Sequence, residues 1–278
     1  MRKLPLYGWA GITILVVGLA ANILTESLFF HTFFTPWMWT GYLLLTDALV
    51  ARLTGRSWLT PEPRRFFSLL FLSLVFWLLF EGYNLHLRNW QYIGLPANPF
   101  VETFGYLWSF VTIWPALFIT ADLLEAFGLK IRGNPLRITQ GRLRSWFAFG
   151  VVAAVGPLLL PGHLAAYTFA IVWVAYVFLL EPLIYPRLEV RSLLREAGEG
   201  EWTRWVSLGL GGLICGFLWE SWNVLSTARW VYTFPLFQNW KLFEMPFPGF
   251  MGFIPFAWEA SAMYSFWLLF RGMRRPAQ

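Results

Sequence analysis

Residues 66–87 read FFSLLFLSLVFWLLFEGYNLHL, and no charged side chain interrupts the run before Glu81. A membrane hydrocarbon core about 30 Å thick is crossed by roughly 20 helical residues, so this run predicts a membrane-spanning helix. Backbone groups in lipid must find their hydrogen bonds within the protein, which favours a helix over an isolated strand. The chain is therefore expected to be a membrane protein.

The composition of the whole chain agrees with this prediction. Hydrophobic residues make up 58% of its 278 residues and charged residues 13%, whereas soluble domains contain about 45–50% apolar and about 25% charged residues. Cys215 is the single cysteine, which excludes a disulfide framework and a cysteine metal cluster. The high share of apolar residues and the low share of charged residues also exclude a soluble enzyme and a disordered chain.

The criterion that identifies residues 66–87 predicts seven further spans. The expected fold class is therefore all-α, a polytopic membrane protein with about eight transmembrane helices. Long unbroken apolar runs do not fit the alternating pattern of an outer-membrane barrel. The other predicted spans are 4–24, 33–53, 103–127, 145–163, 165–186, 205–226 and 250–270.

Basic residues gather on one side of this predicted topology. Of the 21 lysines and arginines, all except Arg88, Arg229 and Lys241 fall in the termini or in connections on the same side. Cytoplasmic loops carry such an excess of basic residues. We therefore predict a bacterial inner-membrane protein with both termini in the cytoplasm. The net charge of +6 then follows from topology, and no nucleic-acid partner is expected.

The pattern of residues at and after the end of the run 66–87 is repeated later in the chain, which predicts an internal duplication. Each half would hold four spans, and an even number inserts both halves in the same orientation, related by a twofold axis along the membrane normal. We expect repeats at 1–128 and 145–278, joined by a basic cytoplasmic linker at 129–144. The matched residues are Glu81 and Glu220, Asn84 and Asn223, Trp90 and Trp230, Tyr92 and Tyr232, and Pro115 and Pro255.

Three carboxylates within the predicted spans are candidates for acid catalysis, because an ionisable group inside the membrane is costly and suggests function. Glu81 and Glu220 would meet near the twofold axis, where like charges favour protonation of one of them. Glu259 lies near the middle of the last span, where the first half has Ile119. We expect Glu259 to share a cavity with Glu220 and to be the main acid. The alternative for each glutamate is a hydrogen bond that fixes helix packing.

The predicted outer connections 88–102 and 229–249 are rich in tryptophan and proline. Such segments suit the headgroup layer of a membrane. We expect them to form irregular or re-entrant caps over an outward-facing cavity with aromatic walls. The candidate substrate-binding residues in and before these segments are Asn84, Trp90, Tyr92, Asn223, Trp230 and Tyr232.

No metal site and no cofactor are predicted. His31, His86 and His163 would all lie on the outer side, but their spacing does not match a zinc or iron motif. Histidines in loops at the membrane surface are the expected explanation.

Three segments of the chain resemble a family of bacterial multi-spanning membrane proteins with a duplicated Glu-x-x-Asn…Trp-x-Tyr unit. The likeness covers most of the chain and implies no particular activity. The segments are Phe80-Glu81-x-x-Asn84 with Trp90-x-Tyr92, Arg64-Arg65-Phe66-Phe67, and Phe118-x-Thr120-Ala121-Asp122-Leu123.

A second similarity is to the membrane lycopene cyclase domain, which also occurs as tandem helical repeats. In that family a Trp-x-Tyr triplet is followed by a Pro-x-Glu-Glu motif. Here Pro99-Phe-Val-Glu102 and Phe243-Glu244-Met-Pro246 follow the two triplets, and neither contains paired glutamates. The resemblance implies that Glu102 and Glu244 contact a polyprenoid substrate, and that glutamates protonate a double bond in a redox-neutral reaction.

Three functions are open from the sequence alone. The first is an enzyme of cyclase, isomerase or hydratase type that acts on a lipid-like or isoprenoid molecule in an outward-facing cavity. The second is a proton-coupled transporter of a small molecule or lipid. The third is a structural or assembly subunit of a membrane complex. Membrane lipids and an apolar ligand are the expected partners, and an oligomer or a complex partner is compatible with all three functions.

Overall fold

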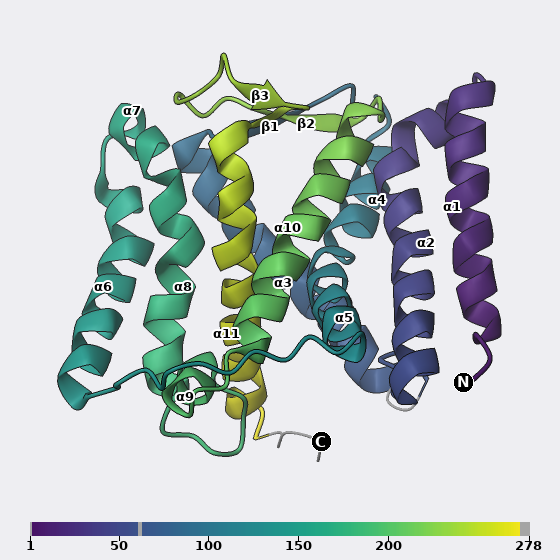
Figure 1. The fold of residues 1–278 in the computed structure, drawn as a ribbon. Coiled ribbons are helices and arrows are strands. Elements are labelled where there is room, and N and C mark those ends of the chain that lie inside the picture. Colours follow the sequence, from purple (N-terminus) through teal and green to yellow (C-terminus); the bar gives the residue numbers. More distant parts are fainter. Residues whose placement is uncertain (1, 61–62, 273–278) are drawn as a thin grey trace.

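The computed structural model describes residues 2–60 and 63–272, and most of them are helical. The longer helices run between two opposite ends of the molecule (Figure 1). The helices are α1 (Leu6–Leu24), α2 (Leu28–Thr54), α3 (Pro63–Leu87), α4 (Pro99–Phe110), α5 (Ile113–Ala126), α6 (Gln140–Leu159), α7 (Gly162–Ala165), α8 (Phe169–Ile184), α9 (Leu193–Gly198), α10 (Thr203–Val224) and α11 (Phe253–Phe270), with 3-10 helices at Ala166–Thr168 and Phe247–Gly252.

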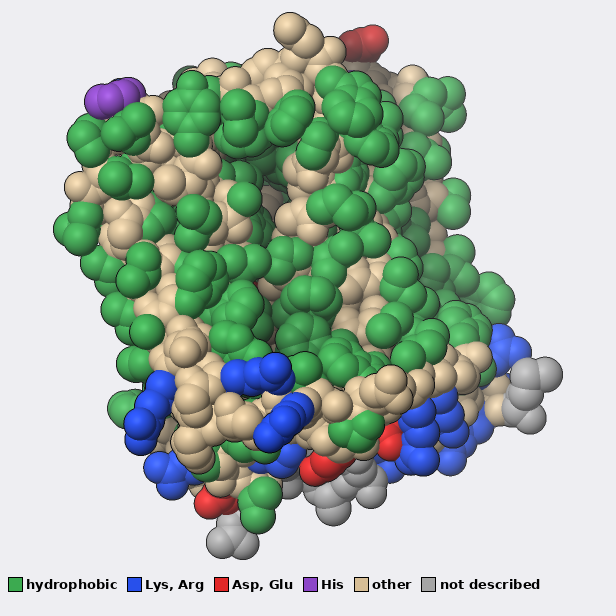
Figure 2. Space-filling model, turned by 60° about the vertical axis from the view of Figure 1, so that its left-hand side comes forward, with side chains coloured by type: hydrophobic (Ala, Val, Ile, Leu, Met, Phe, Trp, Pro, Cys, Tyr) green, Lys and Arg blue, Asp and Glu red, His purple; other side chains and the backbone are tan. Residues whose placement is uncertain are grey.

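Five helical segments among the described residues are long and apolar enough to cross a membrane. They are α1, α3, α4 with α5, α6, and the segment from α7 to α8. Helices α2, α10 and α11 also lie at predicted spans but are not among these five. Apolar side chains cover most of the surface between the two ends (Figure 2). The protein is therefore a helical membrane protein.

The helices form two flanking hairpins and a central group. Helix α1 packs against α2 on one flank, and α6 packs against α8 on the other. Helices α3, α5, α10 and α11 lie between these hairpins (Figure 1). Because α10 packs against α2, α5 and α11, it occupies the centre of the molecule.

Glycines allow α10 to approach α11 closely. A Cβ atom on Gly212 would lie 2.2 Å from the carbonyl oxygen of Phe253, and one on Gly216 would lie 2.2 Å from its ring. Both distances are far below van der Waals contact, so neither position accepts a larger residue without displacement of α11. Glycines at Gly-x-x-x-Gly spacing commonly permit such close approach between helices in membranes.

The predicted span 103–127 is two helices, because α4 ends at Phe110 and α5 starts at Ile113. The hydroxyl of Ser73 on α3 donates to the carbonyl oxygen of Phe110 at 2.6 Å and accepts from the N–H of Trp114 at 3.1 Å. These two backbone groups would bond each other in a continuous helix. Pro115 has no N–H and removes the next helical bond as well. The apolar run 103–127 does not reveal this break, because Ser73 lies on a different helix.

The structure confirms a mainly helical fold and adds two small antiparallel sheets that the sequence did not predict. Strands β1 (Trp90–Ile93) and β2 (Arg229–Tyr232) pair across the two halves of the chain. Strands β3 (Lys241–Leu242) and β4 (Met245–Pro246) form a short hairpin nearby. The outer connections therefore contain ordered strands, where irregular or re-entrant caps were expected. Aromatic residues are common both in strands and at membrane interfaces. The prediction of irregular caps rested on the second tendency alone.

The end of the molecule opposite the β1–β2 sheet carries most of the basic side chains (Figure 2). Helix α1 begins and α11 ends at this end, and the linker between α5 and α6 runs along it (Figure 1). Helix α6 already begins at Gln140, inside the segment predicted as linker. Buried Arg204 on α10 forms ion pairs with Asp122 at 2.6 Å and Glu125 at 3.0 Å on α5, which ties the two helices together here.

Candidate ligand-binding cavity

A cavity of about 520 Å³ lies between the two halves of the chain, and its walls are mainly aromatic. Side chains from five helices contribute to it: Trp39 on α2, Trp77 on α3, Trp173 on α8, Trp219 on α10 and Phe256 on α11. All five helices belong to the central group or contact it. The cavity is therefore built by helix packing and not by a single loop.

The rings of the cavity wall contact one another. Trp39 lies 4.9 Å from Trp219 between ring centroids, and Trp173 lies 4.5 Å from Phe256. Phe256 also contacts Trp77 at 6.1 Å. Aromatic pairs at such distances stabilise each other beyond their simple burial. The wall is thus a connected aromatic surface contributed by both halves.

The β1–β2 sheet brings four predicted binding residues together in the cavity lining. Trp90 pairs with Tyr232, and Tyr92 pairs with Trp230. All four side chains line the cavity. The sheet lies at the end of the molecule away from the basic side chains, across the ends of the central helices (Figure 1).

Glu81 on α3 holds three aromatic side chains through one carboxylate oxygen. Its Oε1 atom accepts hydrogen bonds from Trp77 Nε1 at 3.0 Å, Trp90 Nε1 at 3.1 Å and the Tyr92 hydroxyl at 2.5 Å. Each of the three donors lines the cavity, whereas Glu81 does not. Glu81 therefore fixes the orientation of the cavity wall from behind.

Glu220 on α10 makes the corresponding contacts in the second half. Its Oε1 atom accepts from Trp230 Nε1 at 3.1 Å and from the Tyr232 hydroxyl at 2.9 Å. Burial, and then the Glu220 charge, raise the pKa of Tyr232 well above its ordinary value. Burial and Glu81 act in the same way on the pKa of Tyr92. Both phenols therefore keep the protons that they donate to the glutamates.

Asn84 and Asn223 attach the two strands to the ends of α3 and α10. The side-chain amide of Asn84 donates to the carbonyl oxygen of Trp90 at 2.8 Å and accepts from its N–H at 3.1 Å. Asn223 makes both contacts with Trp230, at 2.8 and 3.0 Å. Neither asparagine lines the cavity, so their contacts position the strands.

Glu259 lies apart from the cavity, contrary to the expectation that it shares one with Glu220. It is completely buried on α11 and accepts a hydrogen bond from the backbone N–H of Tyr176 at 2.8 Å. Its Oε2 atom has no hydrogen-bond partner among the described residues. Neither Glu220 nor Glu259 lines the cavity, because Glu220 faces the β1–β2 sheet and Glu259 faces α8.

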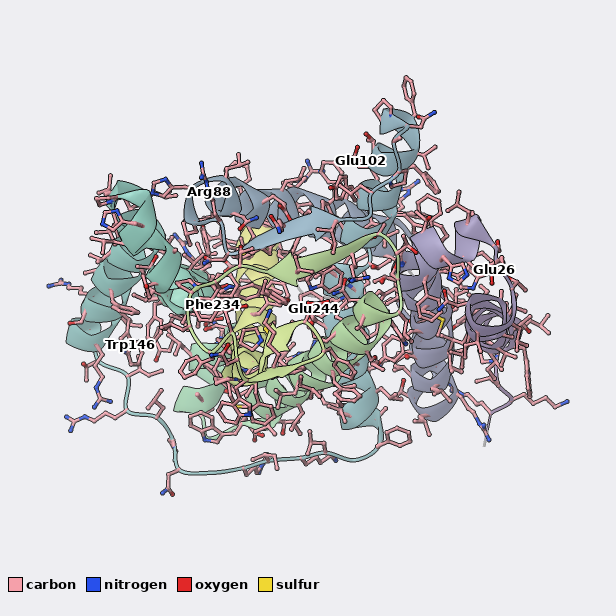
Figure 3. The ribbon with its side chains drawn as sticks, turned by 90° about the horizontal axis from the view of Figure 1, so that it is seen from above. Glu26, Arg88, Glu102, Trp146, Phe234 and Glu244 are labelled. Atoms are coloured by element: carbon pink, nitrogen blue, oxygen red, sulfur yellow. The ribbon has the colours of Figure 1, made fainter. Side chains whose placement is uncertain are left out.

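The two glutamates suggested by the lycopene cyclase resemblance differ in position. Glu102, in the first turn of α4, lines the cavity. Glu244 does not, and its carboxylate lies 3.5 Å from Arg229, which does. In the view from above, Glu102 lies at the periphery of the molecule and Glu244 near its centre (Figure 3).

The tryptophans within the spans were not predicted to belong to the site. Trp39 and Trp173 occupy matching places in the two halves, 134 positions apart (39 to 173), and this match was the available signal. Trp77, Trp219 and Arg229 had no such signal. Their place in the wall depends on how the helices pack.

Within residues 2–60 and 63–272, no group of three His, Cys, Asp or Glu side chains could hold a metal ion. The lining of the cavity consists mainly of aromatic faces and contains few polar groups. No protein-family model, curated protein or solved structure matches the chain, so its functional interpretation depends on this geometry.

Proposed function

We propose that the protein binds an apolar, lipid-like molecule of the isoprenoid class in the cavity between its two halves. The aromatic cavity of about 520 Å³ is the observation that carries this proposal. Ligand pockets typically measure about 300–1,000 Å³ and are mostly apolar. Indole and phenyl rings provide large apolar surfaces that suit an unsaturated hydrocarbon chain.

The architecture that goes with this function is an eight-span inner-membrane protein with the cavity on the outer side. We assign the spans to α1, α2, α3, α4 with α5, α6, α7 to α8, α10 and α11. The positive-inside rule assigns the end rich in arginine to the cytoplasm. The β1–β2 sheet and the cavity mouth then face outward.

Matching contacts in the two halves support an origin by duplication. Gly11 on α1 packs against the backbone of α2, where its Cβ would lie 2.7 Å from Leu45 N. Gly150 on α6 packs against α8 in the same way, 2.3 Å from Leu179 N. The leucines are 134 positions apart (45 to 179), as are the tryptophans of the cavity wall.

The pairing of β1 with β2 supports the same symmetry. A twofold axis through the sheet, between Gln91 and Val231, would exchange the pair Trp90–Tyr232 with the pair Tyr92–Trp230. Two copies of one strand related by a twofold axis pair in this self-complementary way. The cavity would then lie on or near the axis that relates the halves.

Within this proposal Glu81 and Glu220 are positioning residues and not acids that meet the ligand. Their hydrogen bonds go to tryptophan and tyrosine side chains whose rings line the cavity. A carboxylate buried next to indoles and phenols satisfies several donors that would otherwise be unpaired.

Photolabelling tests the proposal. The protein, purified in dodecyl maltoside, would be irradiated with a farnesyl-chain diazirine probe and digested for mass spectrometry. We expect labelled peptides that contain Trp39, Trp173 or Trp219, and competition by unlabelled geranylgeraniol. Ala170→Trp, which adds an indole ring to the cavity lining, should reduce this labelling.

The matched control is Val152→Trp on α6, because Val152 is 66% exposed and does not line the cavity. This variant should label as the wild type does. Equal labelling of both variants, or labels confined to the exposed faces of α1 and α6, would contradict a ligand in the cavity.

A further inference from the structure

We propose that the polar end of the ligand is cationic, an amine or quaternary ammonium group on a long apolar chain, and that it binds beside Glu102. This inference depends on the proposed function, because it places the polar end of the same ligand. It follows from the aromatic rings and the charges around one lobe of the cavity, between α3, α4 and β1.

Aromatic rings surround this lobe. Tyr92 on β1 lies 5.0 Å from Tyr106 on α4 between ring centroids, in an edge-to-face arrangement. Tyr106 lies 5.5 Å from Phe110, and Phe110 lies 6.0 Å from Trp77 on α3. All four side chains line the cavity. Ring faces carry partial negative charge and attract cations, and aromatic cages of this kind recognise quaternary ammonium groups.

Carboxylates add negative charge to the same lobe. Glu102 lines the cavity within one helical turn of Tyr106. Glu81 lies behind Trp77, Trp90 and Tyr92, and its Oε1 atom accepts three hydrogen bonds. Neither glutamate forms a salt bridge among those found for the described residues. A cation entering the lobe would therefore meet negative charge that no arginine or lysine already offsets.

Arg229 is the basic residue of the cavity lining, and it does not reverse this balance. Its Nε atom lies 3.5 Å from Glu244, so its charge has a carboxylate counterpart. The other bases at this end of the molecule are Lys241 on β3, which acts electrostatically on Glu220, and Arg88, which lies two residues before β1. Three basic residues thus accompany four carboxylates, whereas the chain as a whole carries a net charge of +6. The four carboxylates are Glu81, Glu102, Glu220 and Glu244.

A binding experiment with three chains of equal length tests the inference. Decyltrimethylammonium, decanol and decanoate would be titrated into the protein in dodecyl maltoside, freed of choline lipids, and followed by calorimetry. We expect the ammonium probe to bind most tightly. Glu102→Gln should weaken its binding roughly 3- to 10-fold, the range for a partly exposed charge and cation–π contact. Decanol binding should not change.

Two variants separate recognition of the cation from structural damage. Tyr106→Phe keeps the ring and should bind the ammonium probe almost as the wild type does, whereas Tyr106→Leu should lose affinity for it. Glu26→Gln changes an exposed carboxylate outside the cavity and should have no effect.

The outcomes distinguish this inference from the proposed function. If the three probes bind equally, or decanoate binds best, the cationic head is wrong while the apolar cavity stands. If Glu102→Gln weakens all three probes alike, the charge of Glu102 is not the cause and the inference also fails. If none of the probes binds and photolabelling is absent, the proposed function itself is wrong.

Discussion

Glu81 and Glu220 are each surrounded by indole and phenol donors instead of basic side chains. A buried N–H or O–H group that loses its acceptor costs about 1–3 kcal/mol. Glu81 serves three such donors and Glu220 serves two. At the scale of the residue, these carboxylates are therefore expected to matter for the order of the aromatic wall.

Glu81→Leu should lower the free energy of unfolding by about 2 kcal/mol or more, because it removes the acceptor of Trp77, Trp90 and Tyr92. Glu81→Gln keeps an acceptor oxygen and should lose clearly less. Unfolding in mixed micelles, followed by near-ultraviolet circular dichroism, measures both. Equal losses in the two variants would show that the hydrogen bonds at Glu81 do not stabilise the fold.

Glu259→Gln tests a completely buried carboxyl group. Glutamine can still accept the hydrogen bond from the N–H of Tyr176, so we expect normal membrane insertion and an unchanged melting temperature. Glu259→Leu removes that acceptor and should lower the melting temperature by several degrees. A strong loss of stability in Glu259→Gln would mean that the carboxylate charge itself is needed for folding.

At the scale of the element, the agreement between sequence and structure depends on where the deciding contacts lie. The ends of α3 and α10 lie close to the ends of the predicted spans 66–87 and 205–226. Each of these helices coincides with one long apolar run, so its limits depend on residues near each other in the sequence. The break between α4 and α5 depends on Ser73 from α3, and strand β1 exists through its pairing with β2. Such partners are distant in sequence, so hydrophobic periodicity does not reveal them.

Gly212→Ala should destabilise the contact between α10 and α11, because the added Cβ would lie 2.2 Å from the carbonyl oxygen of Phe253. We expect a loss of about 1–3 kcal/mol, typical of overpacking. Gly82→Ala on α3 is the matched control, since no atom lies within 4 Å of its added Cβ. That change should be neutral or slightly stabilising. A reversed order of the two would contradict the described packing of α10.

At the scale of the whole molecule, part of the lining of the candidate cavity could be predicted from the sequence. The matched Trp-x-Tyr triplets pointed to residues that line the cavity, because the duplicated pattern is visible in the sequence. The placement of Glu259 next to α8 and the tryptophans contributed by five helices depend on helix packing. A single sequence does not specify the rotation of one apolar helix against another.

Cysteines at Gln91 and Val231 should form a disulfide that joins the two halves. These residues lie opposite each other in the sheet, and opposite Cα atoms at about 4.5–5.5 Å suit a disulfide. After cleavage at a protease site inserted in the linker, the halves should stay together in non-reducing gels. The pair Glu26→Cys and Gln91→Cys is the control: Glu26 lies in the connection between α1 and α2, and a disulfide between two residues of the first half cannot join the halves (Figure 3). Separation of the halves in the first pair would contradict the β1–β2 register.

A reporter fused after Gln278 tests the proposed orientation. Alkaline phosphatase is active in the periplasm, so a fusion at the C-terminus should show no activity. A fusion in the connection between α10 and β2, near Thr227, should be active if the β1–β2 sheet faces outward. Activity at the C-terminus would reverse the assignment of the basic end to the cytoplasm.

The β1–β2 sheet also has a consequence for biosynthesis. Its strands lie on opposite sides of the linker, so the ribosome completes β1 long before β2 exists. During that interval β1 has no partner strand, and Trp90 and Tyr92 have no sheet to hold them against the cavity. Until then the chain also lacks the part of the cavity wall that Trp219, Trp230 and Phe256 supply. The cavity can therefore be complete only after β2 and α11 have been synthesised, so a chain released early lacks it.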